Sequence, residues 1–334
     1  MKNIVTIAGG NGSAISITAL KRFIPDISLS AIVCMSDSGS SSGRLRKELG
    51  VYPPGDILRA VLAMSFYDYN LLKDIFNKTR FENAGKLDKH SLGNIFLSLS
   101  EKYSSFMDGV EALKQAVNAV GEVYPTTLEK NNLVAELENG DIIFGEGSIC
   151  EPSYDRNIKI KKVWLEKEST VTAESAVMAD KKENKEVPEI YLETKKVLEK
   201  ADYIFLGPGD LYTSIIATIL PEGFKKVLQK TSAKLVYIFG NAIHSDGETG
   251  PTNFSEAVLI LEKYIGRKFD LVVYDNHVLN NEELINYKER GWEPVNYDKE
   301  NLSEHNILEC DYERFGGGLC SDKLSVFLKE IIGL

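Results

Sequence analysis

The 334 residues are 43% hydrophobic and 26% charged, which is the composition of an ordinary globular protein. This length suffices for one large α/β domain or two smaller ones, and we expect a single domain over residues 1–334. The formal net charge of -10 argues against a basic surface of the kind that binds nucleic acid, so no nucleic-acid partner is expected. Any phosphate-bearing ligand must then be held by local cations, amide dipoles or a metal ion.

The four cysteines are scattered and form no C-x-x-C motif, so we expect neither a disulfide framework nor a zinc site. A reduced, cytoplasmic location fits this usage best. No apolar run reaches the roughly 18 residues of a membrane span, and none is expected. A homo-oligomer is expected only because most soluble oligomers are symmetric assemblies of one chain.

Short apolar runs that lead into small or polar loops recur along the chain, at residues 4–7, 30–35, 203–206, 235–239 and 271–274. Helix-like segments separate them, a pattern typical of βα units. It predicts an α/β protein with a three-layer αβα, Rossmann-like fold and a mainly parallel sheet. In such a sheet the loops after the strands gather at one edge, where ligands bind.

The pattern changes within residues 133–166. Asn139 and Gly140 separate two apolar runs, and an Asn-Gly pair supplies the positive φ angles of a two-residue hairpin turn. We therefore expect a small antiparallel β-hairpin appendage on the parallel core.

The loop after the first run is rich in glycine and reads Gly9, Gly10, Asn11, Gly12 and Ser13. Glycines there allow a tight turn and bring amide N–H groups close to an anionic ligand, with a helix N-terminus behind them. The third glycine of the dinucleotide fingerprint is absent, because position 15 is Ile15. We interpret the loop as part of a nucleotide site, and a tight turn without a ligand is the alternative.

The loop after the second run, residues 36–46, is rich in serine. Ser41 and Ser42 offer amides and hydroxyls, and Arg44 and Arg46 are candidate phosphate-binding cations. A solvated surface loop is the alternative interpretation.

Two aspartates near this loop are candidate metal ligands and candidate catalytic residues. Asp37 follows an apolar run and can bind ribose hydroxyls, bind a divalent cation or cap a helix. Asp56 follows Pro53, Pro54 and Gly55, where it is placed to cap a helix through one carboxylate oxygen while the other stays free for a metal. Magnesium takes such oxygen ligands and often bridges carboxylates to phosphates.

Three later segments carry further candidates. One begins an apolar helix after His90, one follows the run at 203–206, and one follows the run at 235–239. Each can be a simple turn, but together at one sheet edge they predict a nucleotide site. The candidate ligand-binding residues in these segments are Asn94, Gly207, Gly209, Asp210, Thr213, Ser214 and Asn241.

These stretches resemble the gluconeogenesis-factor proteins of the YvcK type, which are related to 2-phospho-L-lactate transferase of the CofD type. The matching stretches are AGGNGSA (8–14), SDSGSSSGRLRKELGVYPPGD (36–56), HSLGN (90–94), GEVYPTTL (121–128), AELENGDIIFGEGSI (135–149), ADYIFLGPGDLYTSII (201–216) and GNAIHSDGET (240–249).

The resemblance implies a cytoplasmic Rossmann-like protein with one of two functions. The YvcK branch implies a regulatory protein that binds UDP-sugars and is linked to central carbon metabolism and to cell-wall and cell-shape control. The CofD branch implies magnesium-dependent transfer of a phospholactyl group to a deazaflavin alcohol, with Asp37 and Asp56 matching the metal-holding pair by position.

One departure separates the two functions. The family's Asp-Asp-Gly-Gly is here Asp37-Ser38-Gly39-Ser40, one carboxylate short, which weakens the case for transfer more than the case for binding. We therefore expect a nucleotide-sugar-binding regulatory protein. The transferase is the alternative; no residue is an obvious base for it, and His90 and His244 are candidates. A structural, partner-binding protein whose loops are simple turns is a third interpretation.

Overall fold

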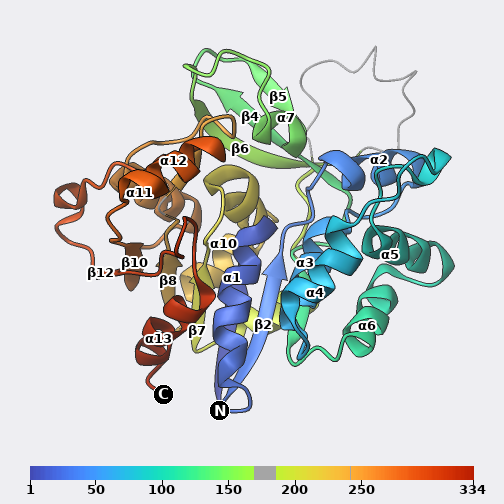
Figure 1. Ribbon diagram of the computed structural model, residues 1–334, viewed down its shortest axis with the longest axis horizontal. Helices are drawn as coiled ribbons and strands as arrows, with labels where there is room; N and C mark the ends of the chain where they lie inside the picture. The colour runs from blue at the N-terminus through green and yellow to red at the C-terminus, as the bar shows by residue number, and fades with distance from the viewer. Residues whose placement is uncertain (169–185, 241) are drawn as a thin grey trace.

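The structure is a computed structural model that describes residues 1–168, 186–240 and 242–334. Its largest element is a seven-stranded sheet of order β12-β10-β8-β7-β1-β2-β3. Every neighbouring pair in this sheet is parallel. Helices cover both faces (Figure 1), which confirms the predicted three-layer fold.

The strands of the main sheet include every predicted run. They are β1 (Lys2–Ile7), β2 (Ile27–Val33), β3 (Glu122–Pro125), β7 (Tyr203–Leu206), β8 (Lys234–Ile238), β10 (Leu271–Asp275) and β12 (Ile307–Cys310). The five predicted runs correspond to β1, β2, β7, β8 and β10. The short edge strands β3 and β12 were not predicted, because four residues at a sheet edge carry little apolar periodicity.

Side chains of each strand alternate between two buried cores, one on each face of the sheet. Ile4 of β1 packs into the first core, and Val5 and Ile7 pack into the second. The first face is covered by α1 (Gly10–Leu20), α3 (Gly55–Met64) and α13 (Ser321–Ile332), with α5 (Leu92–Tyr103) and α6 (Phe106–Ala116) beside α3. The second face is covered by α8 (Leu192–Glu199), α9 (Ala217–Ile219), α10 (Phe224–Lys230) and α11 (Phe254–Ile265). Burial on both faces explains why the central strands are continuous apolar runs rather than alternating ones.

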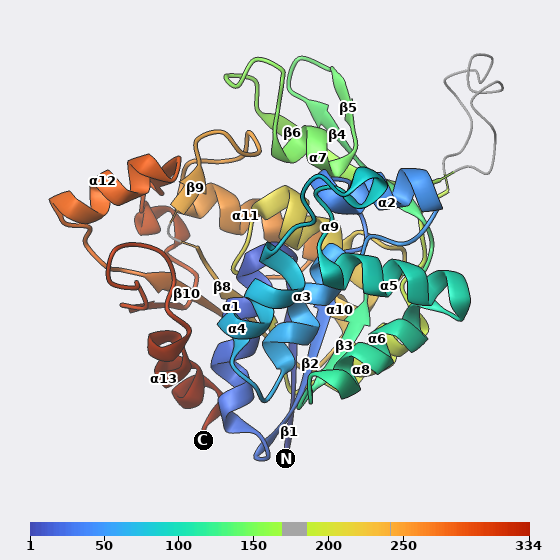
Figure 2. The same cartoon turned by 45° about the vertical axis from the view of Figure 1, so that its right-hand side comes forward.

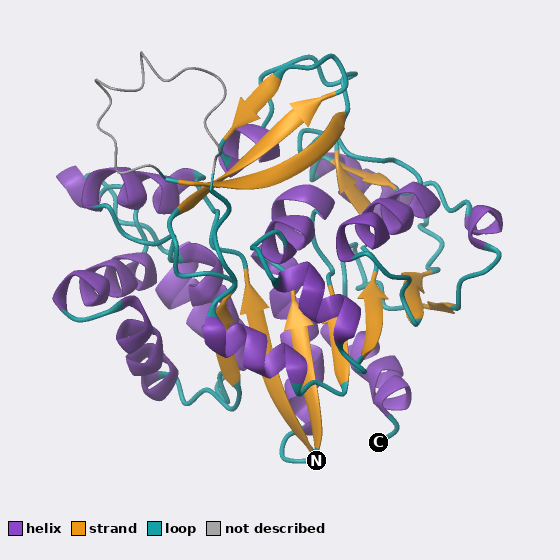
Figure 3. Cartoon of the chain, turned by 180° about the vertical axis from the view of Figure 1, so that it is seen from behind, coloured by secondary structure: helices purple, strands orange, loops and turns teal. Residues whose placement is uncertain are grey.

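A small antiparallel sheet lies beyond the ends of the parallel strands. It consists of β4 (Asn131–Leu137), β5 (Ile142–Phe144) and β6 (Ile160–Lys167), in the order β5-β4-β6. The predicted Asn-Gly turn joins β4 to β5. The appendage has three strands rather than a simple hairpin, because β6 pairs along the whole of β4. Figure 3 shows the parallel strands pointing toward this sheet.

Most of the remaining labelled helices lie toward the small antiparallel sheet, and one lies beside α3 (Figure 2). They are α2 (Ser40–Leu49), α4 (Tyr69–Lys73), α7 (Glu146–Cys150), α12 (Asn281–Glu289) and the short helical segments at 21–23, 74–78, 85–87, 211–216 and 299–302. In the described part of the chain no helix combines the length and hydropathy needed to cross a bilayer.

The order of the strands reverses next to β1. The chain runs from β1 to β2 and β3 in one direction, and then returns so that β7, β8, β10 and β12 extend the sheet the other way. The loops after β1 and β7 consequently diverge on either side of a crevice at the carboxyl ends of the strands. Ligands of open α/β sheets bind at such a crevice, so the topology alone identifies where to look for a site.

Candidate functional site

A cavity of ≈ 1170 Å³ lies at this reversal of strand order. Its lining combines the loop after β1, the loop after β7 and two aspartates from the segments between them. The predicted site residues in the lining are Gly9, Gly10, Asn11, Gly12, Asp37, Asp56, Gly209, Asp210, Thr213 and Ser214. Stretches that are far apart in sequence are therefore brought to one concave surface.

A smaller cavity of ≈ 550 Å³ adjoins the larger one. Ser41, Ser42 and Asn94, which were predicted to belong to the same site as the glycine loops, line this smaller cavity instead. Asp37 and Glu146 line both cavities and so lie at their boundary. What the sequence presented as one site is two adjoining compartments.

The glycines of the loop after β1 are required by close packing. A Cβ on Gly12 would lie 2.0 Å from the carbonyl oxygen of Pro208, and a Cβ on Gly9 would lie 2.8 Å from Oδ2 of Asp56. Gly10 has a φ of 62°, in the left-handed region that favours glycine. Part of the glycine signal is thus explained by contact between loops rather than by a ligand.

The two arginines after the serine loop are engaged by the protein itself. Arg44 lines neither cavity, and its Nη1 donates to the carbonyl oxygen of Asp88 at 2.7 Å. Arg46 donates to the carbonyl oxygens of Ser36 and Asp37, at 3.2 and 3.0 Å. Arg46 therefore fixes the turn that follows β2, and neither arginine is positioned as the predicted phosphate clamp.

Three other predicted residues lie outside the lining or outside the described chain. The hydroxyl of Ser13 donates to the carbonyl oxygen of Gly10 at 3.0 Å, within the first turn of α1. The carbonyl oxygen of Gly207 accepts from the hydroxyl of Ser16 at 2.7 Å. The hydrogen bond of Gly207 joins the loop after β7 to α1, whereas that of Ser13 lies within α1 itself. Asn241 lies outside the described residues.

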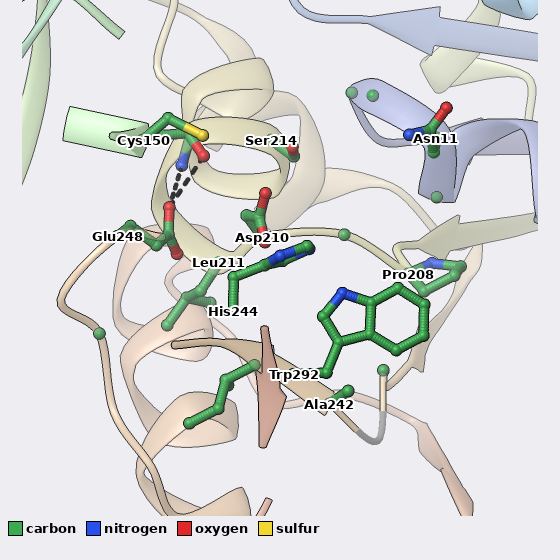
Figure 4. Close-up of a pocket in the computed structure, with 18 of the residues that line it drawn as sticks. Asn11, Cys150, Pro208, Asp210, Leu211, Ser214, Ala242, His244, Glu248 and Trp292 are labelled. Carbon is green, nitrogen blue, oxygen red and sulfur yellow. Dashed lines mark hydrogen bonds between the residues drawn. The ribbon is translucent and has the colours of Figure 1, made fainter. Parts of the chain in front are cut away.

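The turn after β7 already holds a carboxylate of the same chain. Glu248 accepts hydrogen bonds from the amides of Tyr212 and Thr213, both at 2.8 Å, and from the hydroxyl of Thr213 at 2.9 Å. Figure 4 marks two of the hydrogen bonds that Glu248 accepts. The donors of Thr213 that were predicted to face an anionic ligand are therefore taken by Glu248.

Asp37 and Asp56 face the larger cavity from different elements. Oδ1 of Asp37 accepts from the amide of Gly39 at 2.9 Å, and Oδ1 of Asp56 accepts from Nη1 of Arg59 at 2.6 Å. Burial raises the pKa of Asp56 to about 6, with Arg59 opposing the rise and the charge of Asp37 adding to it. The predicted cap role of Asp56 is wrong, because α3 begins at Gly55 and Asp56 lies in its first turn.

Other carboxyl groups of the larger cavity also resist ionisation. Burial, followed by the charge of Asp37, raises the pKa of Glu146 to about 8. Burial, followed by the charge of Asp210, raises the pKa of Glu248 to about 7. Crowded carboxylates of this kind are stabilised by a proton or by a bound cation.

The donor set permits a magnesium ion without resembling a complete metal cage. Among the residues that the structure describes, no group of three or more His, Cys, Asp or Glu side chains has metal-holding geometry. Magnesium, however, is often held by one or two carboxylates together with phosphates of a substrate. The oxygen ligands of Asp37 and Asp56 fit that second arrangement.

Sequence reasoning missed the cations of the larger cavity. They are Arg59, Lys73, Arg156, Lys159 and Arg314. Nζ of Lys73 lies 3.4 Å from Oδ1 of Asn11, beside the loop after β1. Partial burial, followed by the charges of Lys78 and Arg59, lowers the pKa of Lys73. No local motif marks these residues, since they are distributed over several segments.

An aromatic wall was missed for the same reason. Trp292 in β11 (Trp292–Pro294) pairs with His244 in β9 (Ala242–His244), and both residues line the larger cavity. Their rings meet edge to face, with centroids 5.9 Å apart. Figure 4 shows the two rings side by side, next to Asp210. Because the two rings are nearly perpendicular, this aromatic and partly polar wall offers both a ring face and a ring edge to a ligand.

Comparison with known proteins assigns the family. The family model described as 2-phospho-L-lactate transferase CofD matches residues 4–311. The gluconeogenesis factor of Halalkalibacterium halodurans is 32% identical over 321 residues, covering 93% of this chain and 91% of that protein. The gluconeogenesis factor of Bacillus subtilis is 33% identical over 301 residues, covering 90% and 86%. An X-ray structure of a Bacillus halodurans protein is similar with a TM-score of 0.83 and 29% identity, covering 98% of this chain and 99% of that one. The chain therefore belongs to the CofD family, and within it is similar to the proteins named gluconeogenesis factor.

Proposed function

We propose that this protein binds a nucleotide-sugar of the UDP-sugar kind and acts as a regulatory protein. Its relatives are named gluconeogenesis factors, and we propose a role of that kind for this chain. The expected roles are in central carbon metabolism and in cell-wall and cell-shape control. The observation that carries the proposal is the larger cavity at the reversal of strand order, with main chain of two glycine-rich loops in its wall. Its ≈ 1170 Å³ is somewhat larger than typical ligand pockets, which measure about 300–1,000 Å³.

The phosphates are best accommodated on the β1 side of the cavity. Gly9, the residue before α1, provides no side-chain cap, and the first turn of α1 has no acidic residue of its own. The carboxyl group of Asp56, whose pKa is raised to about 6, lies beside Gly9 and bonds the amide of Gly10, so a phosphate here shares this helix end with Asp56. Lys73 and Arg59 line the same cavity and add positive charge. The turn after β7 is less suitable, because the carboxylate of Glu248 is bound there.

The ring end of the ligand is best accommodated on the other side. Trp292 and His244 supply an aromatic wall, and Asp210 beside them supplies hydrogen-bonding oxygens. Burial raises the pKa of Asp210 above its ordinary value, with His244 opposing the rise. This end matches the ring amides and hydroxyls of a nucleoside or sugar better than it matches phosphate.

A panel of UDP-, GDP- and ADP-sugars, each with and without magnesium, tests the proposal by thermal shift. A ligand present at about 100 times its Kd adds roughly 2.7 kcal/mol to the free energy of unfolding. Lys73→Met should weaken binding, while Lys78→Met, which removes a lysine paired with Asp74 outside the cavity, should not. The proposal fails if no nucleotide-sugar produces a shift.

A magnesium-dependent phosphoester transferase is the second candidate. It is favoured by the two carboxylates of Asp37 and Asp56, which line one cavity from separate elements. They would hold the ion, which would supply positive charge to a phosphate. His244 lines the same cavity and remains a candidate base, whereas His90 is buried and bonds Ser41.

Turnover of a nucleotide-activated phospholactate with a deazaflavin alcohol tests this alternative directly. Activity is expected in the native chain with magnesium and should be lost in the Asp37→Asn, Asp56→Asn double variant. Activity that persists in the double variant rejects the carboxylate pair as the metal site.

A further inference from the structure

We propose that His277 is a pH-sensitive clamp, which while protonated holds α12 and the segment 311–318 together and so fixes Trp292 in the wall of the larger cavity. The proposal rests on the proposed function only for the identity of the ligand that Trp292 contacts. Its own evidence is a network of contacts that runs from His277 to Trp292 along two routes. His277 lines neither cavity, so it acts as a positioning residue.

The imidazole of His277 lies between two carboxylates from different elements. Its Nε2 is 2.9 Å from Oε2 of Glu283 in α12, and its Nδ1 is 3.5 Å from Oδ2 of Asp311, which follows β12. A neutral imidazole carries a proton on only one nitrogen, whereas the imidazolium carries one on each. Protonated His277 therefore attracts both carboxylates at once, and neutral His277 can donate to only one of them.

The first route runs through α12. Glu283 lies in the first turn of this helix, and its Oε2 also accepts from the amide of Asn280 at 3.0 Å, so the carboxylate is fixed to the start of the helix. Tyr287 lies one turn further along and is 1% exposed. The ring of Tyr287 meets that of Trp292 edge to face, with centroids 5.4 Å apart. The position of α12 therefore sets the position of a ring against which Trp292 packs.

The second route runs through the segment 311–318. Oδ1 of Asp311 accepts from the amide of Glu313 at 3.0 Å. Oε1 of Glu313 in turn accepts from the amide of Gly318, at the far end of the segment. A Cβ on Gly318 would lie 3.3 Å from Cζ3 of Trp292, so the backbone here packs against the tryptophan ring. Asp311 is thus connected through two hydrogen bonds to backbone that contacts Trp292.

The charged groups around His277 are mostly acidic. Burial opposes the charge on the imidazole, but the hydrogen bonds and charges of Glu283 and Asp311 outweigh it and raise the pKa of His277 above its ordinary 6.5. Asp275, at the end of β10, accepts from the amide of His277 at 3.2 Å, and burial raises the pKa of Asp275 to about 7. Lys323 of α13 bonds Asp311 at 2.9 Å. The clamp is therefore intact below pH 6.5 and is lost as the pH rises through the raised pKa of His277.

The fluorescence of Trp292 in the full, ligand-free chain tests the clamp directly. The background is Trp164→Phe, which leaves Trp292 as the only tryptophan, combined with His244→Gln, which removes the imidazole that contacts its ring. We expect the fluorescence to change with pH, with a midpoint above 6.5. This midpoint should match that of the His277 imidazole, which NMR measures in the native chain and in the background.

Three variants in this background separate the clamp from other titrating groups. His277→Gln should abolish the fluorescence change, because glutamine does not titrate. Asp311→Asn should move the midpoint to lower pH, because it removes a charge that favours the imidazolium. His305→Gln, which changes a histidine paired with Glu262 in another part of the fold, should leave the titration unchanged. The proposal is overturned if the midpoints of the tryptophan and the imidazole differ, or if the change persists in His277→Gln.

Nucleotide-sugar binding at pH 6 and pH 8 separates this proposal from the proposed function. The ratio of the two Kd values should be about fivefold larger in the native chain than in His277→Gln, the size of a modest coupling between two sites. This comparison cancels the effect of Glu248 and Glu146, which line the larger cavity and ionise in the same range. A tryptophan titration that follows His277, without binding of any nucleotide-sugar, would refute only the proposed function. Binding with the same pH dependence in both chains would refute the clamp.

Discussion

The carbonyl oxygen of Pro208 lies 2.0 Å from the position that a Cβ on Gly12 would occupy, so the loops after β1 and β7 are in direct backbone contact. Only glycine allows this approach, and the contact holds the two loops together at the larger cavity. The relative position of the two loops is therefore set by packing, before any ligand is considered.

Gly12→Ala is expected to destabilise the protein, by about 1–3 kcal/mol, the usual cost of inserting atoms into a well-packed region. Gly10→Ala provides the comparison, because its Cβ would lie 3.6 Å from the hydroxyl of Ser214, where there is room. Its cost is the left-handed backbone alone, about 1 kcal/mol. Chemical denaturation measures both changes, and equal losses would contradict the loop contact.

Arg44 and Arg46 should differ when each is changed to alanine. Arg44→Ala should leave nucleotide-sugar affinity unchanged, because Arg44 lines neither cavity. Arg46→Ala should lower the melting temperature, because its side chain is only 8% exposed and donates to the carbonyl oxygens of Ser36 and Asp37. Thermal unfolding with and without ligand measures both effects. A loss of affinity in Arg44→Ala would restore the phosphate-clamp interpretation.

The stability of the protein should fall as the pH rises from about 5 to 8. The pKa of Glu248 is about 7 in the folded chain against an ordinary value of 4.5, so the native state binds more protons than the unfolded state in this range. Glu248→Gln should reduce the slope by up to about 1.4 kcal/mol per pH unit. Denaturant unfolding at several pH values measures it, with the exposed Glu300→Gln as the control. An unchanged slope in Glu248→Gln would refute this assignment.

Tryptophan fluorescence can report on the ring end of the larger cavity. The chain has two tryptophans, and Trp292 lines the cavity while Trp164 lies in β6, with Nε1 donating to Glu166 at 2.8 Å. A fluorescence change on adding nucleotide-sugar should survive Trp164→Phe and disappear in Trp292→Phe. Trp292→Ala should weaken affinity about tenfold or more, the size of a lost base–aromatic stacking contact. Native affinity in Trp292→Ala would exclude this wall as a ligand contact.

The central strands could be predicted from the sequence because parallel strands in the middle of a sheet are buried on both faces. Runs such as 203–206 stand out against the polar loops beside them. The rule that loops gather at the carboxyl ends of strands then located the larger cavity. The edge strand β12 and the pair of β9 with β11 were missed, because they are short and partly exposed.

The direction of individual side chains could not be predicted in the same way. Arg44 and Ser41 are both in α2, yet one bonds Asp88 and the other lines the smaller cavity. Thr213 was a sound candidate from its position after β7, but Glu248 is brought to it by a segment 35 residues away. Contacts of this kind depend on tertiary packing, and the pattern of residues in a short stretch of sequence does not determine them.

Both ends of the chain lie at the end of the sheet opposite the small antiparallel sheet (Figure 1), where Lys2 donates a hydrogen bond to the carbonyl oxygen of Ile332. An affinity tag, a fluorescent reporter or a surface linker can accordingly be attached to either terminus at a distance from the cavities. Immobilised protein should then present both compartments to solution, which makes surface-based binding measurements practical for this chain.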